Sequence, residues 1–170
     1  RVPEVVCWRV LSRENRPNRK RGPSWDFFHS AVDDRSRVAY SEILPDEKAD
    51  TCVAFWQRAR AFYAELGITV TGVMTDNAKA YLCDRFQNAI TEGGARHWSI
   101  PPYSPQINGK VERFNRTFLE EWAYVKPWPD NTTRTAALDD WLHLYNHHRH
   151  HTAVGGPPIS RVNDLPGHYI

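Results

Sequence analysis

The chain has 170 residues, of which 41% are hydrophobic and 25% are charged, and its formal net charge is +2. That length fits one domain, and that composition excludes a wholly disordered chain. No apolar run approaches the roughly 18 residues of a membrane helix and no signal-peptide pattern is present, so we expect a cytoplasmic protein with no membrane partner.

The beginning of the chain is strongly basic. Residues 1–21 carry seven basic and two acidic side chains, a net charge of +5, which leaves the rest of the chain at −3. Clustered Arg and Lys release counterions from phosphate, so one interpretation is an arm that contacts the DNA backbone. The alternative is a solvated basic linker. We predict a basic N-terminal arm or insertion over residues 1–24, with a short strand candidate at 5–10.

Periodicity and turn residues predict the elements that follow. Two apolar runs around an Asp- and Ser-rich turn predict a β-hairpin. Next comes a helix with Asp50 as a plausible N-cap and Gly67 just past its end. The expected elements are the hairpin at 25–32 and 38–44, helix 50–66, strand 68–75, helix 80–91, strand 96–100, helix 108–125 and helix 132–148. This order implies a mixed sheet flanked by helices in three layers, an α/β fold.

Apolar residues recur every three or four positions in the three longer helices, which predicts the faces that they bury. The predicted buried residues are Val53, Trp56, Phe62, Tyr63 and Leu66 in the first, Val111, Phe114, Phe118, Trp122 and Val125 in the second, and Leu138, Trp141, Leu142 and Tyr145 in the third.

Two polar features border these elements. Asp76, in Thr75-Asp76-Asn77, follows a predicted strand, where α/β sheets place ligands; the alternative is an ordinary helix N-cap or turn residue. Glu112 lies in the first turns of helix 108–125, beside its buried stripe. Glu112, Asn115, Arg116 and Leu119 share one face of this helix, and Lys110, Arg113 and Thr117 share an adjacent face. The alternative is an amphipathic helix with a solvated charged side.

Between Asp76 and Glu112 there are 35 residues. With its flanking motifs, this spacing resembles the catalytic core of retroviral integrases and bacterial insertion-sequence transposases, the D,D-35-E family. The matching stretches are Ala31-Val32-Asp33-Asp34-Arg35-Ser36-Arg37, Thr75-Asp76-Asn77, Pro102-Tyr103-Ser104-Pro105-Gln106, Asn108-Gly109-Lys110-Val111-Glu112-Arg113-Phe114-Asn115-Arg116 and Tyr145-Asn146-His147-His148-Arg149.

The resemblance implies an RNase H-like α/β/α fold over residues 25–150, followed by an irregular tail at 151–170. It implies DNA cleavage and strand transfer on transposon ends and target DNA, in a bacterial, nucleoid-associated homo-oligomer. By this resemblance, Asp76 and Glu112 are catalytic residues and two of three ligands of two Mg²⁺ or Mn²⁺ ions, whose hard character suits carboxylate oxygen. The residues implied to contact DNA are Lys110, Arg113, Arg116, Asn108 and Asn115, and Asn115 is alternatively a support for a metal ligand.

The chain departs from the family pattern in three places. The family's first catalytic Asp, on its first strand, has no match, so we expect that strand to be missing or replaced. In the implied strand order 3-2-1-4-5 the missing strand is central, and we expect Val5–Val10 to take its position without supplying an Asp.

Ala78 stands where a Gly is usual, which predicts a strained turn. His150 stands where a Pro usually precedes the last His of the late motif. The histidine-rich run 147–151 admits a zinc site, although a helix end near DNA is the simpler interpretation.

These departures leave alternatives to an active transposase. One is a catalytically inactive remnant that still binds DNA. A second is an RNase H-like nuclease without joining activity, and a third is a structural interaction domain.

Overall fold

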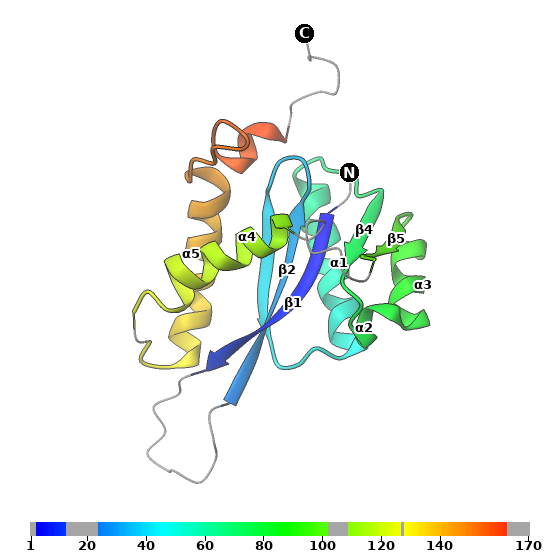
Figure 1. Ribbon diagram of the computed structural model, residues 1–170, viewed down its shortest axis with the longest axis horizontal. Helices are drawn as coiled ribbons and strands as arrows, with labels where there is room; N and C mark the ends of the chain where they lie inside the picture. Colours follow the sequence, from blue (N-terminus) through cyan, green and yellow to red (C-terminus); the bar gives the residue numbers. More distant parts are fainter. Residues whose placement is uncertain (1–2, 13–23, 102–108, 127, 163–170) are drawn as a thin grey trace.

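The fold is built on a mixed five-stranded sheet (Figure 1). The computed structural model describes residues 3–12, 24–101, 109–126 and 128–162, with the backbone alone for 3–12, 24–26 and 131. The strand order is β3-β2-β1-β4-β5; β1, β2 and β3 are antiparallel, whereas β4 and β5 run parallel to β1. The strands are β1 Pro3–Ser12, β2 Ser24–Asp33, β3 Ala39–Leu44, β4 Gly72–Thr75 and β5 Arg96–Ser99.

Strand β1 fills the central position of the sheet. Val5 is paired with Ala31 of β2 on one side and with Thr75 of β4 on the other. This is the position that we expected Val5–Val10 to take, and a longer segment takes it, so residues 3–12 of the predicted basic arm belong to the sheet. Because both edges of β1 are paired, the backbone N–H and C=O groups of β2 and β4 that face the centre of the sheet have hydrogen-bond partners.

Helices cover both faces of the sheet, so the predicted three-layer α/β/α arrangement is confirmed (Figure 1). Strand alternation divides the core, since Ala31 packs on one face of β2 and Phe28 and Val32 pack on the other. One layer holds α1 Ala49–Glu65, α2 Lys79–Leu82 and α3 Asp84–Glu92; the other holds α4 Gly109–Phe118, the π-helical turn η2 Leu119–Ala123 and α5 Asn131–His147.

Helix α1 buries part of its predicted stripe. Trp56 and Tyr63 are fully buried as expected, whereas Val53, Phe62 and Leu66 only border the core. The periodicity analysis missed Cys52, Phe55 and Ala59, which are also buried. The Tyr63 hydroxyl donates to the backbone oxygens of Ala31 (2.8 Å) and Val38 (3.2 Å), which fixes α1 to the hairpin.

The two predicted ends of α1 have different outcomes. Gly67 has a φ of +73°, and the backbone N–H of Ile68 donates to Tyr63 O (2.8 Å), as in a Schellman motif. The predicted N-cap role of Asp50 is wrong, because the helix begins at Ala49 after Lys48 and has no side-chain cap. Asp50 instead pairs with Arg85 of α3 (2.5 Å).

The opposite core is largely aromatic. The Phe28 and Phe118 rings stack with centroids 3.6 Å apart, and Val111, Phe114 and Trp122 are buried as predicted. The prediction for Val125 is wrong, since its side chain is 59% exposed. The α-helix ends at Phe118 and η2 ends at Ala123, so Val125 lies beyond the helical stripe. In α5 the predicted buried set is confirmed: Leu138, Trp141, Leu142 and Tyr145.

Two other predicted elements are shorter than expected. The expected helix 80–91 is divided at Cys83, whose extended backbone (φ −75°, ψ 149°) separates α2 from α3. Only Gly72–Thr75 of the expected strand 68–75 pairs in the sheet. Beyond α5, residues 151–162 form a bridge between His151 and Gly156 and the 3₁₀ turn η3 Pro158–Arg161. None of the helices in the described ranges is long and apolar enough to cross a membrane.

Candidate functional site

One edge of the sheet collects several strand ends. The carboxyl end of β2 lies beside the beginning of β1, where Asp33 pairs with Pro3. The carboxyl end of β4 lies there too, since Thr75 pairs with Val5. Asp76 directly follows Thr75 and therefore stands at this edge, where α/β sheets place ligands.

Asp76 lies in a turn held by short-range hydrogen bonds. Its half-buried carboxylate accepts the backbone N–H of Ala78 (Oδ1 to N, 2.9 Å). Beside it, Thr75 Oγ1 lies 2.8 Å from His97 Nε2, and Asn77 Nδ2 donates to Ile100 O (2.9 Å). The alternative of a helix N-cap does not apply, because α2 is preceded by Ala78 and has no side-chain cap.

The turn is not strained by alanine. Ala78 has φ −63° and ψ 140°, an extended conformation that any residue adopts. The expectation of strain at this position is therefore wrong. A glycine is required only where φ is positive.

Helix α4 begins at the same edge of the sheet. Lys110, in its first turn, forms an ion pair with Asp34, the residue after β2. Glu112 lies two residues further along and is exposed. Figure 1 shows the first turn of α4 beside the end of β1 that lies between the carboxyl ends of β2 and β4. Asp76 and Glu112, 36 positions apart in the sequence, thus stand at one edge of the sheet.

The donor set at this edge fits one hard cation better than two. Two carboxylates with water and phosphate oxygens satisfy a single Mg²⁺, whereas two bridged ions need more carboxylates. Within the described ranges, no three Asp, Glu, His or Cys side chains gather as metal ligands. The β1 residue in register with Thr75 is Val5, and Glu4 is in register with Met74.

The predicted DNA contacts divide into three groups. Arg113 and Arg116 are exposed on α4, and Lys110 is half-buried in its pair with Asp34. Asn115 is only 2% exposed, and its Oδ1 accepts the Ser30 hydroxyl (3.3 Å). We therefore remove Asn115 from the DNA-contacting set, because the face of α4 that carries it packs on β2. Asn108 lies outside the described residues.

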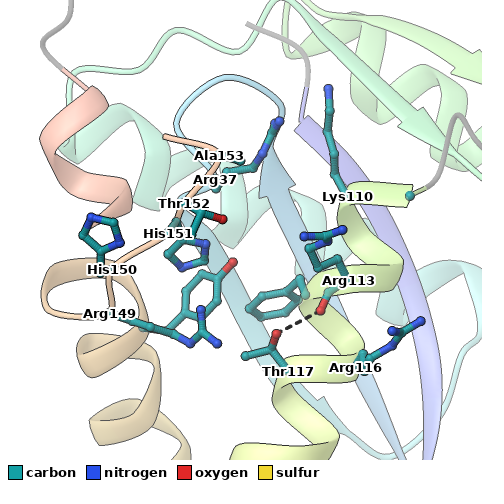
Figure 2. Close-up of a pocket in the computed structure, with 13 residues that line it drawn as sticks. Arg37, Lys110, Arg113, Arg116, Thr117, Arg149, His150, His151, Thr152 and Ala153 are labelled. Atoms are coloured by element: carbon teal, nitrogen blue, oxygen red, sulfur yellow. Dashed lines mark hydrogen bonds between the residues drawn. The ribbon is translucent and has the colours of Figure 1, made fainter. Parts of the chain in front are cut away.

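A pocket of about 790 Å³ opens beside α4 (Figure 2). Gly109, Lys110, Arg113 and Thr117 of α4 face Arg37 of the β2–β3 turn and Arg149 after α5 across it. Sequence analysis did not assign Arg37 to a site, and it treated Arg149, His150 and His151 only as part of a possible zinc site or of a helix end near DNA. The only local signal was the basic character of the runs 35–37 and 147–151.

The histidine-rich run does not gather as the zinc alternative required. His143 Nε2 lies 3.2 Å from His148 Nε2, and the His143 and His147 rings stack with centroids 4.6 Å apart. His151 turns away and packs against the Tyr145 ring (4.7 Å). Burial, followed by the charge of Arg149, lowers the pKa of His151 to about 4, so its imidazole is neutral at pH 7.

Sequence comparisons find similarity to integrases. Residues 94–158 match the family model described as Integrase core domain. The putative integrase ORF3 of Spiroplasma virus SpV1-C74 is 22% identical over 153 residues, which cover 82% of this chain and 42% of that protein. The retrovirus-related Pol polyprotein from transposon TNT 1-94 of Nicotiana tabacum is 31% identical over 96 residues, 56% of this chain and 7% of that protein. The chain thus spans less than half the length of these relatives.

Solved structures give the same fold. The HTLV-2 integrase catalytic core domain in complex with magnesium superposes with a TM-score of 0.69 at 18% identity, covering 94% of each chain. That domain has been described in trimeric and dimeric forms. A chain of the simian T-cell lymphotropic virus intasome in complex with PP2A regulatory subunit B56 gamma gives a TM-score of 0.71 at 22% identity, covering 96% of this chain and 55% of that chain.

Proposed function

We propose that this chain, an integrase-type catalytic core by its fold and its sequence similarity, cuts DNA at the ends of a mobile element and joins them to target DNA. The observation that supports the proposal is that the turn with Asp76 and the first turn of α4, which contains Glu112, lie at one sheet edge, with exposed arginines on the same helix as Glu112. Fold alone does not set a reaction, so the proposal depends on this site.

Asp76 and Glu112 would hold a Mg²⁺ or Mn²⁺ ion through their carboxylate oxygens. When bound, such an ion polarises the phosphodiester and favours an attacking water or 3′-hydroxyl oxygen. The turn at Ala78 fixes Asp76 through its backbone N–H, and the pair of Lys110 with Asp34 fixes the first turn of α4. Both carboxylates therefore stand on well-anchored elements before any ion binds.

Arg113 and Arg116 would contact the DNA backbone. Neither side chain forms an ion pair or hydrogen bond within the part of the chain that the structure describes, and both are exposed. Guanidinium groups recognise phosphate through paired N–H donors without reading sequence. We also propose that the chain acts as a homo-oligomer on transposon ends and target DNA, in keeping with the dimeric and trimeric forms of the HTLV-2 core.

One observation favours a second candidate, a DNA-binding domain without catalytic activity. The central strand presents Val5 beside Thr75, so the register beside Asp76 lacks a carboxylate. Two bridged ions then lose one of their ligands.

The decisive experiment is a cleavage and strand-transfer assay with the full chain, a duplex carrying the element's terminal sequence, and Mn²⁺ or Mg²⁺. We expect metal-dependent nicking and a joined product that Asp76→Asn and Glu112→Gln each abolish. Asp84→Asn, at the exposed start of α3, is the matched control and should retain activity.

Each outcome of this assay separates the candidates. DNA binding without cleavage in either metal would favour the inactive domain. Cleavage without joining would favour a nuclease. Cleavage that survives both Asp76→Asn and Glu112→Gln would overturn the assignment of the site.

A further inference from the structure

The pocket beside α4 has an unusual charge for its size. None of its described lining residues is acidic. Five of them are basic: Arg37, Lys110, Arg113, Arg116 and Arg149. Asp34 and Glu121 lie outside it and offset part of this charge. Lys110 forms an ion pair with Asp34, whose Oδ1 also lies 3.9 Å from Arg37 Nη1. Arg149 forms an ion pair with Glu121 (Nη2 to Oε1, 2.6 Å). A net positive charge remains, because two carboxylates offset five basic side chains.

The floor of the pocket is rigid and apolar. Phe114 and Tyr145 are buried, and their rings meet edge to face with centroids 4.9 Å apart. The His151 ring packs on Tyr145 from the other side (4.7 Å). At the wall, the Thr117 hydroxyl donates to the backbone oxygen of Arg113 (3.0 Å), as Figure 2 shows. Cationic groups therefore stand at the rim of a preformed hollow. The protein loses little conformational freedom when an anion binds there.

The pocket adjoins the carboxylate site without including it. Glu112 is not among its lining residues, but Arg116, one helical turn after Glu112, is. Residues four apart share one ridge of a helix, so Arg116 stands between Glu112 and the pocket. A strand lying over Glu112 would thus meet Arg116 next and the pocket after it.

We propose that this pocket binds a phosphodiester group of the DNA strand that continues past the carboxylate site, with Arg113 and Arg149 as its two principal contacts. The inference rests on the proposed function, because it assigns the path of the same DNA. It adds the segment after α5 and the β2–β3 turn to the DNA-binding surface, far in sequence from α4. Its contacts are with phosphate, so it binds DNA without selecting a sequence.

The test measures binding of a fluorescein-labelled 20-base-pair duplex to the full chain without divalent metal, by anisotropy over a range of NaCl concentrations. Each lost phosphate contact lowers the slope of log affinity against log salt by about 0.9. Arg113→Gln should therefore weaken binding roughly eightfold at 0.1 M salt, and Arg113→Gln with Arg149→Gln roughly 60-fold. Arg85→Gln, which removes an exposed arginine of α3 on the opposite face, should leave the slope unchanged.

Several results would overturn the pocket. One is an unchanged slope in the double variant with a wild-type melting temperature. Another is displacement of the duplex by polyglutamate of equal charge, with the same dependence on Arg113, since that would mark a general anion surface. Should Arg149→Gln disturb folding, Arg113→Gln alone decides, because that side chain is exposed.

The two proposals fail separately. If Asp76→Asn and Glu112→Gln retain cleavage while the salt slopes behave as expected, the catalytic assignment is wrong and the pocket stands. If both variants lose cleavage while the double arginine variant binds normally, the pocket is wrong and the catalytic assignment stands.

Discussion

Lys110 in the first turn of α4 is paired with Asp34, the residue that follows β2. This contact joins residues 76 positions apart and fixes where α4 begins relative to the sheet. It also partly neutralises a cation that the resemblance assigned to DNA. One carboxylate thus positions the helix and lowers its positive charge.

Asp34→Asn should strengthen DNA binding. The substitution removes the charge that offsets Lys110, so the ammonium becomes available to phosphate and the salt slope should steepen by up to about 0.9. Folding stability should fall by less than about 1 kcal/mol, because the pair is partly exposed. Anisotropy and urea titrations measure the two effects. Asp50→Asn, which breaks the exposed pair with Arg85, is the control and should not alter binding; equal binding by both variants would contradict this account.

Val6→Asp should raise Mn²⁺-dependent cleavage. In the parallel register Val5 lies beside Thr75, so the next residue, Val6, is in register with Asp76. An Asp there would supply a third carboxylate on the face of the sheet that carries Asp76, whereas Val5→Asp would place it on the other face. The cleavage assay compares both variants, with Asp76→Asn added as a background. A gain with Val5→Asp but not with Val6→Asp would refute the register.

Asn146→Ala should destabilise the fold by about 2–4 kcal/mol. The Asn146 side chain donates to Ala39 O and accepts from Ala39 N, both at 2.8 Å, and it is buried. Removing it leaves two buried backbone groups of β3 without these partners. Urea denaturation followed by circular dichroism gives the free energy of unfolding. The neighbouring His147→Ala is exposed and should change it by less than about 0.5 kcal/mol, so equal losses would count against the argument.

Acidification should destabilise the protein before its carboxylates titrate. Burial lowers the pKa of His29, His97 and His151 below their ordinary value, and that of His151 to about 4. The unfolded chain therefore binds protons first, so these groups stabilise the fold above pH 6.5 and lose that contribution as the pH falls from 6.5 toward 4. Urea midpoints at pH 7.5, 6.5 and 5.5 should decline in that order. A flat profile would mean that these histidines are equally protonated in both states.

His29→Gln tests one of the three histidines that contribute to that decline. The His29 side chain is fully buried and its Nε2 lies 2.9 Å from Asp46 O. Glutamine does not titrate, so the difference in stability between pH 7.5 and pH 5.5 should shrink even if the variant is less stable throughout. An unchanged difference would move the effect to His97 and His151.

The sequence by itself determined the local elements and one chemical spacing. Two apolar runs on both sides of a polar turn predicted the hairpin. Apolar residues every three or four positions predicted the buried faces of α4 and α5, because burial on one side of a helix imposes its repeat on the chain. The interval of 35 residues between Asp76 and Glu112 indicated the integrase resemblance. This signal was also visible in the sequence, because each acid stands at the end of an element that can be predicted locally.

Tertiary contacts decided the rest. The same helical repeat cannot tell that Asn115 packs under Ser30 or that Val125 lies past a π-helical turn. The pocket depends on Arg37, Arg113 and Arg149 meeting across three separate segments. Local propensity acts over a few residues, whereas these positions are set by how two helical layers close on a sheet, and no spacing along the chain encodes that closure.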